Sequence, residues 1–209
     1  MSGASEAELR ASIVAAARSL HGRSLTHGST GNISVRLGER ILLTPTGSSL
    51  GTVEPGELSV IGLDGTPISG PKPSKEAFLH AAVLRSRPQD AAVVHTHSTF
   101  SVAVSCLAEV DPENVLPPLT AYYAMRVGTL RLLPYHAPGD ASLEPLAEAA
   151  AREHHAFLLA NHGPVVSGAT LAGAVDALEE LEQTARLFVL LAGQRTRPLT
   201  AEQAAALRP

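Results

Sequence analysis

The hydrophobic positions of this chain follow two periods, which predicts a mixture of helices and strands. Apolar residues recur about every 3.6 positions in five segments, so amphipathic helices are predicted over residues 5–21, 75–87, 99–107, 142–153 and 170–192. Shorter apolar or alternating runs predict strands at residues 33–37, 40–44, 58–63, 66–69, 91–97, 129–133, 156–160 and 164–167.

The connections between these elements predict the fold class. Gly38-Glu39 joins two predicted strands as a hairpin, and Asp64-Gly65 is typical of a second, type I′ hairpin turn. The proline-rich segment from 113 to 138 is expected to be loop and short strands. Helices and strands intermix without strict alternation, which favours a single α/β domain over residues 1–209, with three α/β/α layers around a mixed, mostly antiparallel sheet.

Composition and charge narrow the functional classes. The 209 residues are 44% apolar and 17% charged, as in an ordinary globular protein. The net charge of −4 and the absence of a Lys/Arg block argue against nucleic acid as a partner, and no stretch reaches the ~20 apolar residues of a membrane span. The N-terminus lacks a signal-peptide pattern. The single cysteine, Cys106, is expected to be buried and inert, which fits a cytoplasmic protein.

Three histidines at the ends of apolar runs are the candidate metal ligands. His95 and His97 follow the run 91–94, and residues i and i+2 of a strand point to the same side. His162 follows the apolar run 156–160. Three neutral imidazoles that converge would bind a divalent metal and leave a coordination position open. The alternative is that these are hydrogen-bonded histidines at strand ends, because a His-x-His pair alone is a weak motif.

Glu76 is the candidate general acid or base. It is predicted to lie in the first turn of the helix over 75–87, next to a proline-rich loop. The alternative is an ordinary first-turn glutamate that the helix dipole stabilises. His80 lies one turn further along that helix, either on the surface or in support of the site, whereas His21, His27 and His136 have no evident partner.

Three short loops share the small and hydroxyl-bearing residues that bind anions. They are Gly28–Asn32, Thr44–Ser48 and Ser74-Lys75. Glycines, hydroxyls and a helix N-terminus together could hold a phosphate monoester, although each loop by itself is also an ordinary turn. No nucleotide-binding fingerprint is present.

These motifs, in this order, resemble the class II aldolase/adducin family over nearly the whole chain. The motifs are Gly28-Ser-Thr-Gly-Asn-Ile-Ser34, Leu43-Thr-Pro-Thr-Gly-Ser48, Pro73-Ser-Lys-Glu76, His95-Thr-His97 and Asn161-His-Gly163. Within the family, stretches such as Gly70–Glu76 and Leu158–Pro164 are most similar to the 3-oxo-tetronate 4-phosphate decarboxylases. The resemblance implies a class II aldolase-like fold, a sugar-acid catabolic enzyme and a homotetramer.

The resemblance also implies site residues. His95, His97 and His162 would bind the metal, with Zn²⁺ expected and Mn²⁺, Co²⁺ or Mg²⁺ as alternatives. Glu76 would be the acid/base. The phosphate would be bound by residues of the three loops, namely Gly31, Asn32, Thr46, Gly47 and Ser74. Tyr122 would enter a neighbouring subunit's site, and the adjacent Tyr123 is the alternative candidate for this role.

The expected reaction is decarboxylation of a phosphorylated sugar acid. A 3-oxo-tetronate 4-phosphate would lose CO2 through a metal-stabilised enediolate to give dihydroxyacetone phosphate. Simple sugar-phosphate aldolases of the family usually have serine where this chain has Lys75, which suggests a cation for a substrate carboxylate. The alternatives are a fuculose- or ribulose-phosphate aldolase, an epimerase, and a non-enzymatic interaction module like the adducin head.

Overall fold

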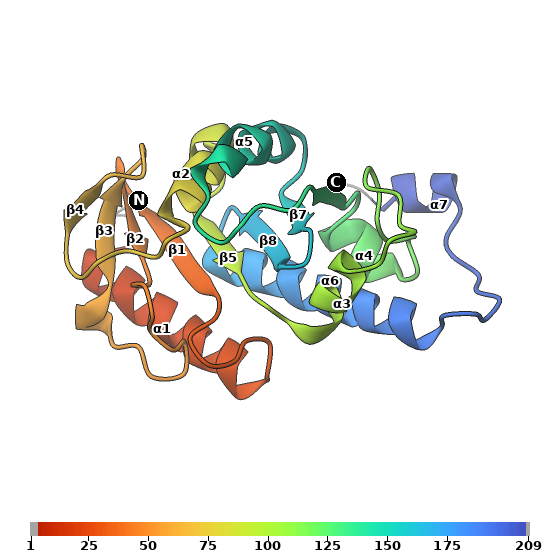
Figure 1. The fold of residues 1–209 in the computed structure, drawn as a ribbon, viewed down its shortest axis with the longest axis horizontal. Coiled ribbons are helices and arrows are strands. Elements are labelled where there is room, and N and C mark those ends of the chain that lie inside the picture. Colours follow the sequence, from red (N-terminus) through yellow and green to blue (C-terminus); the bar gives the residue numbers. More distant parts are fainter. Residues whose placement is uncertain (1–3, 208–209) are drawn as a thin grey trace.

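The computed structural model describes residues 4–207, in which eight strands form one sheet in the order β4-β3-β2-β1-β5-β8-β7-β6 (Figure 1). The strands are β1 (Asn32–Leu37), β2 (Arg40–Leu43), β3 (Ser59–Gly62), β4 (Pro67–Ser69), β5 (Ala92–His95), β6 (Arg131–Leu133), β7 (Ala156–Leu159) and β8 (Gly163–Gly168). Among these described strands only β6 and β7 pair in parallel. The sheet is therefore mixed and mostly antiparallel, as the sequence predicted.

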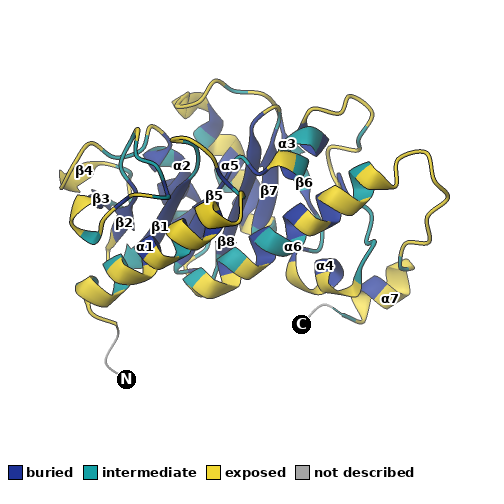
Figure 2. Cartoon of the chain, turned by 90° about the horizontal axis from the view of Figure 1, so that it is seen from below, coloured by how far each residue is buried: buried dark blue, intermediate teal, exposed yellow. Residues whose placement is uncertain are grey.

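Helices cover both faces of the sheet (Figures 1 and 2). The described chain contains α1 (Glu6–Gly22), α2 (Ala77–Ser86), α3 (Thr99–Ser105), α4 (Ala121–Arg126), α5 (Glu144–Glu153), α6 (Leu171–Leu190) and α7 (Ala201–Ala205), with 3-10 turns at Pro55–Glu57 and Ala141–Leu143. Helices α1, α3 and α6 pack into one apolar core, and α2 and α5 pack into the other. This arrangement confirms the predicted α/β/α layers.

The alternation of side chains along β5 explains why the sheet has two cores. Val94 packs against the α1 and α6 side, whereas Val93 packs against the α2 and α5 side. His95 follows in register and therefore faces the α2 side. Because β5 lies between β1 and β8, His95 stands opposite Asn32 on one neighbour and Val165 on the other. The sheet register thus brings the motif residues to one end of the central strands.

The first helix forms as its sequence predicts. Ser5 and Glu8 form a capping box, in which each side chain accepts the backbone N–H of the other residue. The buried face of α1 comprises Ile13, Val14, Ala17 and Leu20. Within residues 4–207, every helix is too short or too polar to cross a membrane.

Three expectations differ from the structure. Helix α4 lies in the segment predicted to be loop and short strands, since Thr120 caps it through the Tyr123 N–H. Strand β5 ends at His95, so His97 lies in the irregular link to α3 rather than on a strand. Helix α3 ends at Ser105, and Cys106 is exposed instead of buried because the helical apolar face stops before it.

Candidate metal centre and active site

The imidazoles of His95, His97 and His162 meet at the end of the central strands. One nitrogen atom of each ring lies within 4.8 Å of the corresponding atoms of the other two, and the Nε2 atoms of His95 and His97 are 3.2 Å apart. Two nitrogen ligands of a tetrahedral ion, each bound at about 2.0–2.1 Å, lie about 3.3 Å apart. The spacing and the chemistry of this donor set therefore fit a divalent metal ion.

The backbone around His162 allows this close approach. His162 lies in the short turn between β7 and β8, where Asn161 has a positive φ of 56° and the His162 N–H donates to the Leu159 carbonyl at 3.1 Å. A Cβ atom at Gly163 would clash with the Thr96 carbonyl oxygen. Only glycine therefore lets the turn that carries His162 pack against the segment that joins His95 to His97.

Hydrogen bonding and burial prepare the imidazoles to bind metal. His95 is completely buried, and its Nδ1 atom lies 2.8 Å from the Pro164 carbonyl oxygen. Because a carbonyl only accepts, Nδ1 carries the proton and Nε2 presents a lone pair to the cluster. Burial, together with the neighbouring His95, lowers the pKa of His97 to about 3 and that of His162 to about 4. Both rings are therefore neutral at physiological pH, as metal ligands must be.

Glu76 faces the histidine cluster from the start of α2. It is the N-cap residue of that helix and not part of its first turn, because its φ and ψ of −100° and 18° are not helical. One carboxylate oxygen lies 3.3 Å from His162 Nε2, and the other lies 3.5 Å from His95 Nε2. The buried carboxylate is thus close to where a ligand of the metal would stand.

Glu76 is negatively charged in this environment. Burial raises its pKa, whereas electrostatic interaction with His95 and the hydrogen bond from Asn32 lower it. With the smaller contributions of His162 and His80, the lowering outweighs the effect of burial. The net pKa is lowered to about 2. A carboxylate in this state can only accept hydrogen bonds, as it does from Asn32.

The three predicted anion-binding loops border one cavity of about 250 Å³. The six candidate residues, Gly31, Asn32, Thr46, Gly47, Ser74 and Lys75, all line it, together with Glu76, His97 and His162. Ser74 Oγ accepts from the Glu76 N–H at 3.2 Å and from Asn32 Nδ2 at 3.1 Å. Its own hydroxyl proton is therefore available to a ligand in the cavity.

Gly31 lets the first loop pack against β5, the strand that ends at His95. Its φ is +79°, and a Cβ atom there would lie 2.9 Å from the His95 carbonyl oxygen and 3.0 Å from Thr26 Oγ1. Neither contact has room for a side chain, so glycine is required for the loop to pack directly against β5.

A second cavity of about 510 Å³ adjoins the first at His97 and His162. His27, His136 and Tyr135 also line it, although the sequence had given the two histidines no partner. The sequence gives little indication of this position for His27 and His136, because both lie in loops that are distant in sequence from the candidate metal ligands. His97 and His162 therefore lie between two adjoining cavities rather than at the bottom of a single one.

The structure separates the two tyrosine candidates. Tyr122 on α4 is 58% exposed, and the guanidinium carbon of Arg126 lies 5.8 Å from the centre of its ring. Tyr123 is buried in the core. Neither lines the two cavities at the histidine cluster, and of the two only Tyr122 is accessible from outside the molecule.

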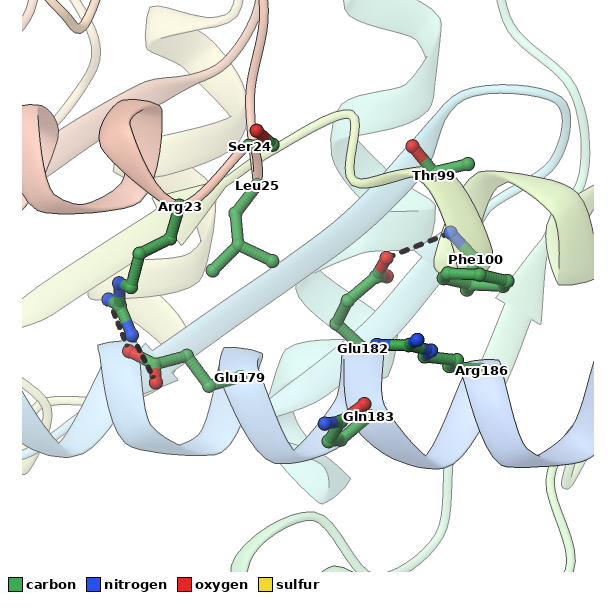
Figure 3. A pocket seen from close by; sticks show the side chains of 9 residues that line it. All are labelled: Arg23, Ser24, Leu25, Thr99, Phe100, Glu179, Glu182, Gln183 and Arg186. Atoms are coloured by element: carbon green, nitrogen blue, oxygen red, sulfur yellow. Dashed lines mark hydrogen bonds and ion pairs between the residues drawn. The ribbon is translucent and has the colours of Figure 1, made fainter.

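A carboxylate that sequence reasoning missed holds the helix that follows His97. Glu182 projects from α6 and accepts the backbone N–H group of Phe100 at 2.8 Å (Figure 3). It also accepts the backbone N–H group of Ser101 at 2.8 Å. The burial of Glu182 could have been predicted, since it lies in the apolar stripe of α6 beside Leu178 and Leu181. The surrounding cavity of about 370 Å³ contains none of the clustered histidines.

Residues 11–189 match the family described as Class II Aldolase and Adducin N-terminal domain. The chain therefore belongs to the class II aldolase/adducin family, as the motifs indicated.

Individual relatives extend over nearly the whole chain. The 3-oxo-tetronate 4-phosphate decarboxylase of Escherichia coli strain K12 is 47% identical over 205 residues, which cover 97% of this chain and 96% of that protein. The L-fuculose phosphate aldolase of Methanocaldococcus jannaschii is 36% identical over 83% of this chain and 91% of its own length. The crystal structure of YgbL from Klebsiella pneumoniae is 44% identical with a TM-score of 0.96, covering 99% of this chain and 100% of that one.

Proposed function

We propose that this chain is a metal-dependent carboxy-lyase that converts a 3-oxo-tetronate 4-phosphate to dihydroxyacetone phosphate and CO2. The observation that carries the proposal is the cavity shared by the anion-binding loops, Glu76 and two clustered histidines. The name of the Escherichia coli relative, at 47% identity over 97% of the chain, supports decarboxylation over aldol cleavage.

The metal would supply the electrophile for this reaction. A divalent ion held by His95, His97 and His162 is a Lewis acid for the C3 ketone oxygen of a 3-oxo acid. Zn²⁺ is the proposed ion, because three imidazoles with an open position are typical of catalytic zinc. Imidazole also binds other divalent first-row metals, so metal analysis has to decide between them.

The small-residue loops are proposed to hold the C4 phosphate. The Ser74 and Thr46 hydroxyls and the backbone of Gly31 and Gly47 line the same cavity and suit phosphate oxygens. Asn32 belongs to the same wall, but its Nδ2 atom donates to Glu76 at 2.8 Å. Its main contribution is therefore to orient Glu76, which refines the role that the sequence suggested.

Glu76 is proposed to deliver to C2 the proton that takes the place of CO2. When the C1–C2 bond breaks, CO2 leaves and the electron pair stays on C2, delocalised toward the C3 oxygen. C2 then needs one proton to become the hydroxymethyl carbon of dihydroxyacetone phosphate. The Glu76 carboxylate is positioned to hold a water molecule and pass its proton to C2.

Lys75 is proposed to recognise the C1 carboxylate. Lys75 is next to Glu76 in the chain and lines the same cavity. An ammonium group at the entrance attracts a substrate that is negatively charged at both ends.

The proposed assembly is a cytoplasmic homotetramer in which Tyr122 reaches a neighbouring copy's site. Exposed apolar side chains lie on α4 and at the end of α6, where Tyr122, Met125, Leu187, Leu190 and Leu191 are between 37% and 63% exposed. Exposed apolar surface of this kind favours contact with another protein surface.

A product assay on a substrate panel tests the proposal. The purified, metal-loaded protein is offered 3-oxo-tetronate 4-phosphates of both C2 configurations, fuculose 1-phosphate and ribulose 5-phosphate. We expect CO2 release from a 3-oxo-tetronate 4-phosphate. No CO2 release, together with cleavage of the fuculose or ribulose phosphate, would replace the proposal with an aldolase. A correctly folded protein that binds no metal would favour an interaction module.

A further inference from the structure

We propose that His80 is a positioning residue whose imidazole fixes the orientation of the Asn32 amide and, through it, the carboxylate of Glu76. The inference rests on the proposed function only in that Glu76 takes part in turnover. The hydrogen-bonded chain itself can be tested in the metal-free protein.

His80 is completely buried one turn beyond Glu76 on α2. Its backbone N–H donates to the Glu76 carbonyl at 3.2 Å, which sets the ring above the start of β1. Both ring nitrogens have partners on that strand. Nε2 contacts Asn32 Oδ1, and Nδ1 lies 2.7 Å from Ser34 Oγ.

The charge of Glu76 determines the direction of every hydrogen bond in the series that joins Ser34, His80, Asn32 and Glu76. Asn32 Nδ2 lies 2.8 Å from a Glu76 carboxylate oxygen, which can only accept. The amide nitrogen of Asn32 must therefore face Glu76, and its oxygen must face His80. That oxygen also only accepts, so His80 Nε2 carries the ring proton.

The same reasoning gives the direction of the hydrogen bond between His80 and Ser34. Neutral histidine has one protonated nitrogen, so Nδ1 of His80 accepts and the Ser34 hydroxyl donates. Burial keeps this ring neutral, lowering the pKa of His80 to about 3. Protons therefore point in one direction from Ser34 through His80 and Asn32 to Glu76.

This directionality gives His80 a task that an apolar side chain could not perform. A reversed Asn32 amide would place its oxygen against the Glu76 carboxylate, where two acceptors repel. His80 opposes the reversal while the Ser34 hydroxyl donates to its Nδ1 atom, because its Nε2–H then faces the Asn32 amide and can donate only to the amide oxygen. Asn32 also stands opposite His95 in the sheet register, so the amide is fixed between the metal-binding strand and Glu76.

Three variants separate positioning from packing. His80→Leu fills the space without either hydrogen bond, whereas His80→Gln retains an N–H that can donate to the Asn32 oxygen. Leu79→Ala is the matched control, because Leu79 is equally buried on the same helix but belongs to the apolar core. Each variant is measured for metal content, melting temperature, kcat and KM.

We expect His80→Leu to retain metal and lose about 10- to 100-fold in kcat with little change in KM, as for residues that orient a reacting group through another. His80→Gln should recover most of that loss, and Leu79→Ala should melt earlier but keep its kcat. The proposal is overturned if His80→Leu is as active as Leu79→Ala, or if His80→Gln is no better than His80→Leu.

The second measurement does not need turnover. In metal-free protein labelled with ¹⁵N at histidine, signals lost in His80→Gln identify the His80 ring. We expect a protonated Nε2 that exchanges slowly and an unprotonated Nδ1; a protonated Nδ1 overturns the proposal. If the wild type releases no CO2 but has this tautomer, the proposed function fails and the positioning chain stands.

Discussion

Oε2 of Glu182 lies 2.8 Å from the backbone nitrogen of Ser101 and 2.6 Å from its hydroxyl, which ties the middle of α6 to the start of α3. The N-cap residue of α3, Ser98, makes no capping bond with its side chain. The buried carboxylate of another helix therefore satisfies N–H groups that a local cap normally takes. Since α3 begins two residues after His97, this contact also supports the segment that carries this candidate metal ligand.

Glu182→Ala should destabilise the protein by about 2 kcal/mol, because it leaves buried N–H groups without an acceptor. The start of α3 should then loosen and weaken metal binding at His97. Urea unfolding of the metal-free protein and titration with Zn²⁺ measure the two effects. Gln183→Ala, an exposed change on the same helix, is the control. Equal unfolding midpoints for the two variants would contradict the capping role.

Glu76→Gln should leave the metal content intact and lower kcat about 10²- to 10⁴-fold, the usual effect of removing a general acid or base. The amide has nearly the same shape but cannot accept and release a proton. Metal analysis and steady-state kinetics check both parts. His97→Ala is the contrasting variant, since it should lose metal and turnover together. Unchanged kcat in Glu76→Gln would remove Glu76 from the reaction.

Lys75→Ser should raise KM for the 3-oxo-tetronate 4-phosphate about 10- to 100-fold, because a hydrogen bond to a charged group is worth about 1.5–3 kcal/mol. The effect of Lys72→Ser isolates general charge attraction, since Lys72 is an exposed cation three residues away that does not line the cavity. Initial rates over a range of substrate concentrations are the measurement. The same KM in both variants would exclude a specific contact with Lys75.

The metal-free protein should lose stability as the pH falls from about 6.5 to 4. Burial lowers the pKa of His80, His97 and His162 to about 3–4, so in this window the unfolded chain binds more protons than the folded one. Unfolding free energy therefore rises with pH, by up to about 1.4 kcal/mol per pH unit for each histidine.

Glu76 extends this dependence to lower pH. Its pKa is lowered to about 2 from 4.5, so the stability it contributes is lost as the pH falls through that range. Urea unfolding at pH 7 and pH 5.5 tests the histidine part, and His80→Gln should show a smaller difference. Equal unfolding free energies at the two pH values would contradict neutral, buried imidazoles.

Much of the fold could be predicted because local patterns agree with it. The apolar face of α1 and the two hairpins carry their own signals in the sequence. Helix α4 was missed because prolines surround it and its cap, Thr120, is a single residue. The end of β5 at His95 depends on pairing with β1 and β8. The periodicity of hydrophobic residues within the strand contains no information about this pairing.

The site was predictable as a set of residues but not as a network. Motif order identified His95, His97, His162, Glu76 and the loop residues, and all of these lie together. The fixed Asn32 amide could not be predicted, because it depends on the register of β1 against β5 and on the rotation of α2. The burial of Glu182 could be predicted from its place on α6, but its hydrogen-bond partners could not, since they are about 80 residues away.

The most direct test of the central claim follows the C1 carbon of the substrate. Metal-loaded protein is incubated in D2O with 3-oxo-tetronate 4-phosphate labelled with ¹³C at C1, and the products are observed by NMR. The account predicts that the label appears as ¹³CO2 and bicarbonate, while dihydroxyacetone phosphate forms with one deuterium on its hydroxymethyl carbon. Label that remains in a carboxylate while the substrate is consumed would contradict it.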